Sequence, residues 1–448
     1  MNRPADTPTT TATATGADTV ALRGATLIDG NGGAPIPNAV LVLRGGAIVA
    51  AGPVQSVAVP AGAQIIDYSG KTIMPGLVSD HVHVGLIDGV DGGPQFYNRA
   101  NILRQLRQYE AYGVTTITSL GCNGPLFGEL RDEMHGGKTP GADLFGVDRG
   151  IGVPNGAPPA NLLVVGADQL DRPETPEQAR VAVRGMVGRR TDLVKLWLDD
   201  FGGSLPVKMK PEIYRAAIDE AHAHGIRVAA HIHDLADAEA VTHAGADILA
   251  HGVRDKPVDA ELVRWLKDHS VWYIPTLSLD ESTFAYAARP AWVLEPFAQH
   301  ALQPAVRARI DDPAWRERTE KAPNSAAART SLAVNLRNVK ALYDAGVSIG
   351  FGSDSGATPL RVAGLAEHRE LALLVEAGLT PLQAITVATR NAAALLKLND
   401  RGVLAVGKRA DLVVLDADPT QSIANTKAIV AVWHRGRLAG GRVETFEP

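Results

Sequence analysis

The chain has 448 residues, of which 45% are hydrophobic and 21% charged, and its formal net charge is −5. It is too long for one small domain, and its composition is that of a globular protein. The mild negative charge argues against nucleic acid or an anionic membrane as partner, so a small-molecule substrate is expected. Cys122 is the only cysteine, which excludes an internal disulfide and is compatible with a reducing compartment.

Residues 1–18 are rich in Thr, Ala and Pro and contain no hydrophobic stretch. This composition predicts a disordered tail and not a signal peptide. No apolar run approaches the roughly 18 residues that a membrane-spanning helix needs. A cytoplasmic protein is therefore expected, the alternative being an exported protein whose signal peptide has been removed.

Residues 19–75 form short runs rich in β-branched residues, such as "TVALRGATLIDG" and "AVLVLRGGAIVAAG", separated by turns that contain glycine. Residues 398–448 show the same pattern in "ADLVVLDADP" and "AIVAVWHRGRLAGG". Both segments are predicted to consist of strands. Because chain termini often lie close together, the two segments are expected to form one small β-sandwich domain.

The sequence pattern changes over residues 76–397. Here eight short apolar runs alternate with helical patterns, several of which end in glycine. This order predicts a (β/α)8 barrel. A doubly wound sheet is the alternative, but no G-x-G-x-x-G follows an early strand. Residues 281–330, after the seventh strand, are predicted to be a helical insertion with two tryptophans. The insertion is either a lid or substrate wall over the catalytic face or a surface decoration.

Chemistry-bearing side chains lie at the ends of several predicted strands. In "SDHVHVG" the spacing of His81 and His83 turns both rings to the same face of a strand. Matching strand ends carry four more such residues: Lys195, His231, His251 and Asp354. Strand ends converge at the mouth of a barrel, so these side chains are expected to meet. Imidazole and carboxylate together suit a catalytic Zn²⁺ site, with Mn²⁺, Co²⁺ and Ni²⁺ as alternatives.

Lys195 is unusual because it lies in the apolar run "DLVKLWLD". A buried cation is costly, so the neutral amine is favoured there. A neutral amine in a metal site can add CO₂ and become an anionic carbamate that ligates metal. The alternative is an ion pair with one of three nearby acids, Asp192, Asp199 or Asp200. The residues alone leave the two readings open.

Six segments in order, "MPGLVSDHVHVG", "DLVKLWLD", "RVAAHIH", "GADILAHGV", "GVSIGFGSDSG" and "GVLAVGKRADLVVLDADP", resemble the amidohydrolase superfamily. The likeness runs over about residues 20–440 and is greatest to the imidazolonepropionase-like and Xaa-Pro-dipeptidase-like branch. It implies a distorted (β/α)8 barrel flanked by a β-sandwich from both chain ends. The loops after the second and third strands, "TSLG" and "RGIGVPNGAPPANLL", depart from the family pattern and leave the substrate open.

The resemblance also implies roles for the strand-end residues. It assigns His81, His83 and Asp354 to a more buried metal ion and His231 with His251 to a second. It makes Lys195, as a carbamate, the bridge between two divalent ions, with zinc the first choice. The ligating histidines should each donate their other N–H to a neighbouring acceptor.

The expected function is hydrolysis of an amide C–N bond, in a dipeptide or an N-acyl amino acid. A hydroxide held between the two ions would attack, with Asp354 as general base and His231 as the second catalytic residue. The alternative is a hydrolase of a cyclic amide, lactone or carbamate, or a deaminase, with a single metal. A non-catalytic relative is a third hypothesis, but such a protein should have lost ligands. A homo-oligomer is expected.

A few further residues have two readings each. Arg254 is expected either to bind a substrate carboxylate or to form a surface ion pair. Tyr273 and Thr276 either line the pocket or pack the barrel, and His233 is a candidate for a supporting contact. Surface positions are expected for three helical histidines, His222, His224 and His243. His368 is expected at the surface or in support of the site.

Overall fold

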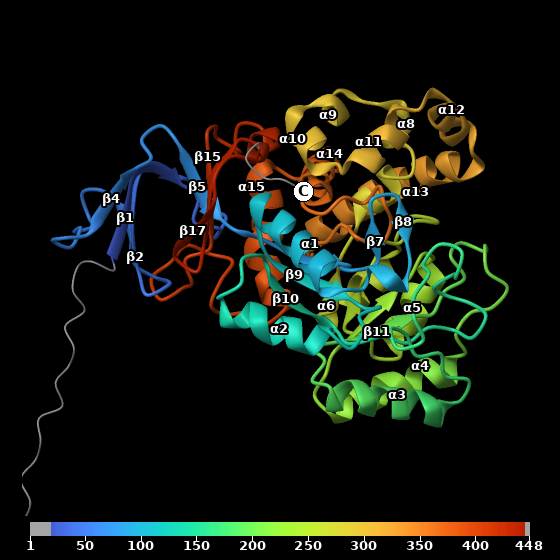
Figure 1. Cartoon of the computed structure of the whole chain (residues 1–448). Coiled ribbons are helices and arrows are strands. Elements are labelled where there is room, and N and C mark those ends of the chain that lie inside the picture. Colours follow the sequence, from blue (N-terminus) through green and yellow to red (C-terminus); the bar gives the residue numbers. More distant parts are fainter. Residues whose placement is uncertain (1–18, 444–448) are drawn as a thin grey trace, which may run out of the picture.

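The computed structural model describes residues 19–443, and the predicted N-terminal tail lies outside them (Figure 1). The two chain ends form one eight-stranded sheet in the order β17-β16-β15-β5-β1-β2-β3, with β4 paired to β1. Its strands are β1 (Thr19–Leu27), β2 (Ile36–Arg44), β3 (Ala47–Pro53), β4 (Gln64–Asp67), β5 (Thr72–Pro75), β15 (Leu412–Leu415), β16 (Ile429–His434) and β17 (Arg437–Gly440). Figure 1 shows the blue strands beside the red ones at one end of the molecule.

The junction between the two ends is the antiparallel pair β5 and β15, in which Met74 lies opposite Val413. Apolar residues such as Leu22, Leu41 and Trp433 are buried together in one core of this sheet. The chain ends therefore meet as predicted. Within residues 19–443 they form one sheet, so the two-sheet sandwich is not confirmed.

The central part of the chain contains two parallel sheets. One has the order β10-β9-β6, with β6 (Leu77–Val82), β9 (Val114–Leu120) and β10 (Asp143–Val147). The other has the order β11-β12-β13-β14, with β11 (Val194–Trp197), β12 (Val228–His231), β13 (Ile248–Leu249) and β14 (Trp272–Tyr273). All residues of β6, β9, β11 and β12 are buried, as expected for parallel strands covered on both faces.

Isolated parallel bridges connect these sheets. Ile151 bridges to Leu196, and the predicted eighth strand, residues 347–355, makes only bridges, Ile349 to Tyr273 and Ser355 to Val82. The fold is thus an α/β arrangement of the barrel type, but its strands are not hydrogen-bonded into one continuous closed sheet.

Helices alternate with these strands. They are α1 (Arg99–Ala111), α2 (Phe127–Gly136), α3 (Pro176–Gly188), α4 (Pro211–Ala223), α5 (Leu235–His243), α6 (Ala260–Asp268), α13 (Pro323–Asp344), α14 (Leu365–Glu376), α15 (Pro381–Thr386) and α16 (Ala392–Leu395). Side-chain caps begin several of them, as where Asp259 accepts from the backbone N–H of Leu262 at 2.8 Å. No helix of residues 19–443 combines the length and apolar character needed to cross a membrane.

The predicted insertion is helical. After α7 (Leu277–Glu281) it contains α8 (Ala285–Ala288), α9 (Ala291–Leu294), α10 (Pro296–Ala301), α11 (Pro304–Asp311) and α12 (Pro313–Lys321). Proline in the first turn begins α10, α11, α12 and α13, where its missing N–H costs no hydrogen bond. Helix α13 starts at Pro323, inside the predicted insertion, and continues beyond its predicted end at residue 330.

A buried ion-pair cluster connects the central part to the terminal sheet. Asp143, the first residue of β10, is fully buried and pairs with three arginines that all come from the C-terminal segment: Arg401, Arg409 and Arg435. Burial by itself would raise the pKa of Asp143, but these arginines hold it well below its ordinary value. The cluster therefore stabilises the contact between the two parts of the molecule.

Asp143→Asn is expected to lower the free energy of unfolding at pH 7 by about 3–5 kcal/mol, because it removes the buried carboxylate that the three arginines share, although Arg401 and Arg409 each keep a second acidic partner. The pKa of Asp143 is lower in the folded protein than in the unfolded chain, where it is about 3.9. Its contribution to stability is therefore fully present above that pH and is lost as the pH falls toward the folded pKa. Urea denaturation at pH 7 and at acid pH checks both points. The matched control, Lys321→Ala, breaks an exposed pair with Glu317 and should change little. Equal stability of the two variants at pH 7 would contradict the assignment.

Candidate metal centre

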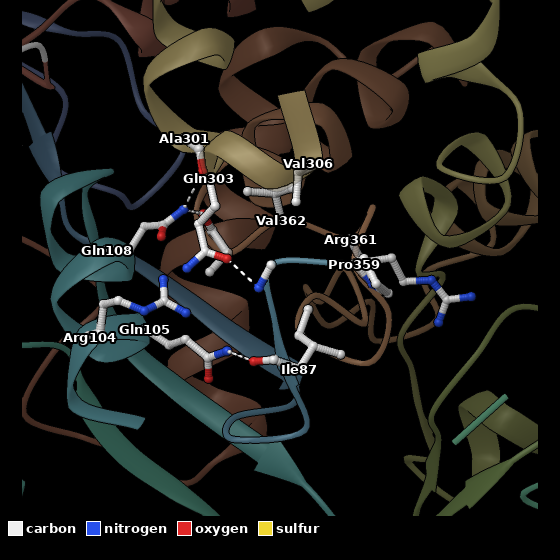
Figure 2. Close-up of a pocket in the computed structure, with 13 residues that line it drawn as sticks. Ile87, Arg104, Gln105, Gln108, Ala301, Gln303, Val306, Pro359, Arg361 and Val362 are labelled. Carbon is white, nitrogen blue, oxygen red and sulfur yellow. Dashed lines mark hydrogen bonds between the residues drawn. The ribbon is translucent and has the colours of Figure 1, made fainter. Parts of the chain in front are cut away.

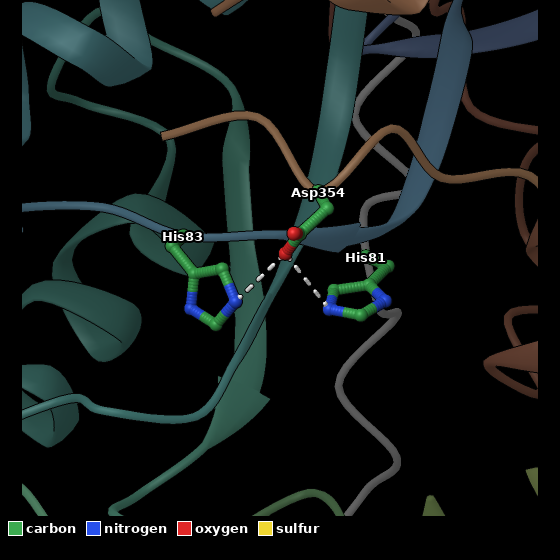
Figure 3. A group of neighbouring side chains, drawn as sticks. All are labelled: His81, His83 and Asp354. Carbon is green, nitrogen blue, oxygen red and sulfur yellow. Dashed lines mark ion pairs between the residues drawn. The ribbon is translucent and has the colours of Figure 1, made fainter. Parts of the chain in front are cut away.

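The two histidines of the "SDHVHVG" segment converge on one carboxylate. His81 lies near the end of β6, His83 follows the strand, and both rings are buried. Their Nε2 atoms lie 3.2 and 3.1 Å from the same oxygen, Oδ1 of Asp354 (Figure 3). One ligand atom from each of the three residues lies within 4.8 Å of the others, so the group could hold a metal ion.

The opposite ring nitrogens of these histidines are engaged. Nδ1–H of His81 donates to the carbonyl of Ala250 at 2.6 Å, and Nδ1–H of His83 donates to that of Gly121 at 3.1 Å. A carbonyl oxygen only accepts, so in each ring the proton is assigned to Nδ1. The lone pair of Nε2 therefore faces Asp354 and is available to a metal.

A second pair of histidines lies beside the first. His231 ends β12 and His251 follows β13, and their ring centroids are 4.1 Å apart. The ring of His251 is 4.6 Å from that of His81, and its Nδ1 forms a 2.8 Å hydrogen bond with Oγ1 of Thr276. His231 stacks on Phe201, and neither of its ring nitrogens makes a hydrogen bond within residues 19–443. The predicted N–H partner is thus present for three of the four histidines.

Lys195, on β11, is fully buried between these histidines and Trp197. Its Nζ lies 5.4 Å from the Trp197 ring centroid and has no hydrogen-bond partner in the described part of the chain. Burial lowers the pKa of Lys195 to about 7. Burial, followed by the charge of Lys195, likewise lowers the pKa of His81 to about 3.

The alternative reading of Lys195 requires a carboxylate partner. Two of the three candidates lie near other basic side chains, and the third forms no ion pair with Lys195. Asp192 pairs with Arg131, and Asp200 lies 3.6 Å from Lys208. Asp199 is buried, but neither of its oxygens makes a hydrogen bond to the residues described. Lys195 forms no ion pair in residues 19–443, so the ion-pair reading is not supported.

Several of the buried polar atoms without a hydrogen-bond partner among the described residues belong to neighbouring side chains, since Nε2 of His231 lies 3.6 Å from Oδ1 of Asp199 and the charge of Asp199 acts on Lys195. They belong to Lys195, His231 and Asp199, and leaving such a group unsatisfied costs about 1–3 kcal/mol. Native proteins satisfy groups of this kind with hydrogen bonds, water or metal ions. Nitrogen and carboxylate donors in one buried cluster fit a divalent metal of the zinc type.

A pocket of about 670 Å³, partly open to solvent, reaches this cluster. His83, His231, His251 and Asp354 line it together with Arg254, Arg361 and His233. The remaining wall is mostly apolar or aromatic and is formed by Pro158, Leu162, Leu163, Trp197, Phe201, Leu279 and Ala357, together with the polar Thr358. No residue of the 281–330 insertion lines this pocket in the structure, so the lid reading of that segment gains no support.

Two arginines of the pocket are engaged in ion pairs. Arg254 pairs with Asp280 at 3.3 Å and is only 6% exposed, so its surface reading is wrong. Arg361 pairs with Oδ2 of Asp354. Burial raises the pKa of Asp354, but opposing influences, of which the charge of the Arg361 guanidinium is the largest, hold that pKa well below its ordinary value. Arg361 lies in a loop without a periodic pattern, so no signal in the sequence points to it.

Other histidines and strand residues are placed as follows. His222, His224 and His243 are exposed, as expected. His368 is buried and hydrogen-bonds Thr426 and the carbonyl of Tyr112, so its surface placement is wrong. Tyr273 donates to Asn335 within the core and does not line the pocket.

A neighbouring pocket is also lined by Arg361, but its amide side chains bond the backbone of other segments (Figure 2). The Nε2 of Gln108 donates to the carbonyls of Ala301 and Ala363, and Nε2 of Gln105 donates to that of Ile87. Figure 2 shows the guanidinium of Arg361 pointing away from these amides. The amides connect α1 to the insertion, and no substrate role is assigned to them.

Known proteins resemble this chain over most of its length. A sequence model of the amidohydrolase family matches residues 72–440. An imidazolonepropionase from Deinococcus radiodurans is 25% identical over 422 residues, which cover 87% of this chain and 88% of the relative.

Two solved structures resemble the fold over most of its length. The crystal structure of a Bifidobacterium longum protein assigned as a prolidase matches with a TM-score of 0.72 at 26% identity, covering 94% of each chain. That of a Xaa-Pro dipeptidase with bound methionine matches with a TM-score of 0.73, covering 94% of this chain and 99% of that one. At 22% sequence identity, this match shows a likeness of fold alone.

Proposed function

Because the chain belongs to the amidohydrolase family, we propose that it is a metal-dependent hydrolase that cleaves the amide C–N bond of a dipeptide or an N-acyl amino acid. The observation that carries the proposal is the convergence of His81 and His83 on Asp354, with the rings of His231 and His251 beside them. Chemistry of this kind depends on the site and not on the fold.

The proposed ligands form two groups. His81, His83 and Asp354 would hold one divalent ion, and His231 with His251 would hold the second, with zinc as the first choice. A carbamate on Lys195 would connect them. The free Nε2 lone pairs and the unpartnered Nζ support this assignment.

When bound, the ions would supply a Lewis acid for the scissile carbonyl and lower the pKa of the attacking water. The protein's part begins with Asp354, whose carboxylate is aimed at both histidines and can accept the proton of that water. It then returns the proton to the leaving nitrogen. His231 is the second proposed catalytic residue because it lines the pocket and neither ring nitrogen makes a hydrogen bond within residues 19–443, its Nε2 lying 3.6 Å from Oδ1 of Asp199.

The pocket supports a substrate with a carboxylate and an apolar side chain. Arg254 and Arg361 are the cations that line it, and guanidinium binds carboxylate with two parallel hydrogen bonds. Leu162, Leu163 and Leu279 offer an apolar wall for the side chain. An α-carboxylate beside an amide is what a dipeptide and an N-acyl amino acid share.

Metal analysis and a hydrolysis screen test the proposal together. Purified protein reloaded with Zn²⁺ should contain about two equivalents per chain, and clearly under one would contradict a binuclear centre. Dipeptides and N-acyl amino acids should be hydrolysed, and their C-terminal amides should lose at least about tenfold in kcat/KM, as for one lost charge-assisted contact. Turnover confined to lactones, carbamates or cyclic amides would favour the other class of hydrolase.

A further inference from the structure

Helix α14 places two carboxylates, Glu367 and Glu370, behind the metal centre. Both are fully buried, and neither lines the pocket that reaches the metal-centre cluster. Their positions differ by three residues, so they lie on the same face of the helix. Burial raises the pKa of Glu370 to about 8, which shows how unfavourable the interior is for its charged form. A carboxyl group kept at this place calls for a specific role.

Glu370 bonds the backbone at the start of α7. Its Oε1 accepts from the N–H of Leu277 at 2.9 Å, and its Oε2 accepts from the N–H of Ser278 at 2.7 Å. Both oxygens are therefore used on two consecutive amides, which an apolar residue or a single acceptor could not satisfy.

The residue just before these amides is strained. Thr276 has φ 46° and ψ 50°, a left-handed conformation that is unfavourable for a β-branched side chain. Such a conformation costs about 1–3 kcal/mol and persists only where surrounding contacts hold it. In this conformation Oγ1 of Thr276 meets Nδ1 of His251 at 2.8 Å.

Glu367 bonds the serine hydroxyls on both sides of Asp354. Its Oε1 accepts from Ser355 Oγ at 2.8 Å and also from Ser353 Oγ. These serines flank Asp354, whose φ of 56° is also left-handed. Thr276 is thus held through the amides that follow it and Asp354 through the serines that flank it, in each case by one carboxylate of α14.

We propose that Glu370 is a positioning residue for the metal centre: it holds Thr276 in the conformation that orients His251, as Glu367 does for Asp354. The inference rests on the proposed function, because His251 is taken as a metal ligand. Glu370 does not touch substrate or metal and acts through the backbone of Leu277 and Ser278.

The test is the Zn²⁺ affinity of the metal-free protein, measured by competition with a chromophoric chelator. Glu370→Gln keeps the shape but replaces one acceptor by a donor, and Thr276→Val removes the hydroxyl that meets His251. Each should weaken binding of the less tightly held ion by about 10–100-fold. Thr276→Ser restores the hydroxyl and should bind close to the parent. The double variant Glu370→Gln/Thr276→Val should be no more than about threefold weaker than the worse single variant, because both act on one contact.

The control is Glu110→Gln on α1, which removes another buried carboxylate, one that pairs with His434 at 2.6 Å away from the metal centre. It should lower the thermal midpoint and leave Zn²⁺ affinity unchanged. Parent-like affinity in Glu370→Gln, or full additivity in the double variant, would overturn the inference. If Glu370→Gln does not fold, parent-like affinity in Thr276→Val overturns it instead. A parent that binds Zn²⁺ but hydrolyses none of the substrates contradicts the proposed function alone, whereas a parent that binds no Zn²⁺ contradicts both.

Discussion

Asp354→Asn is expected to lower kcat by about two to four orders of magnitude, the usual range for loss of a general acid–base group. Asparagine has the same shape and still offers an oxygen toward His81 and His83, but it cannot take a proton. The variant should therefore fold, retain much of its metal and fail in turnover. Steady-state kinetics together with metal analysis of the same sample separate these effects.

His222→Asn is the matched control, because His222 is an exposed histidine that pairs with Asp247 away from the pocket. Its kcat should equal that of the parent. Near-normal kcat in Asp354→Asn at full metal content would show that the proton goes elsewhere. His231 and His233, which both line the pocket, would then be the next acceptors to replace.

Lys195→Ala is expected to lower kcat/KM by at least about 100-fold, because loss of a bridging ligand should cost at least as much as loss of a residue that supports a ligand. The truncated side chain leaves a buried space beside Trp197, and a small carboxylate could occupy it. Acetate added at millimolar concentration should therefore restore part of the activity of Lys195→Ala and none of the activity of Asp354→Asn.

A crystal of the metal-loaded parent grown with bicarbonate tests the proposed carbamate directly. Density for the added CO₂ group on Nζ of Lys195 is the expected result, and an unmodified lysine at full metal content would contradict it. Lys267→Ala, at an exposed lysine of α6, is the kinetic control and should respond to neither bicarbonate nor acetate.

Local patterns in the sequence predicted the residues that are proposed as the donor set of this centre. His81 and His83 could be read as a pair because a spacing of two residues decides which way neighbouring side chains of a strand point. The ends of apolar runs likewise marked Lys195, His231 and His251, since parallel strands present their carboxyl ends at one edge. The resemblance to the amidohydrolase superfamily, which rests on the same segments, is confirmed by the family match over residues 72–440.

Tertiary structure decided what no spacing encodes. Arg361 meets Asp354, and Glu370 reaches Leu277 from 93 residues away, because the fold brings separate loops and helices together. The left-handed backbone at Thr276 has no residue-type signal, since neither glycine nor asparagine marks it. The predicted eighth strand forms only bridges, and the chain ends form one sheet, because pairing depends on partners distant in sequence. The sequence by itself thus determined which chemical groups are present and roughly where they lie. Only the folded chain determined how each is oriented, because orientation depends on buried contacts between residues far apart in the sequence.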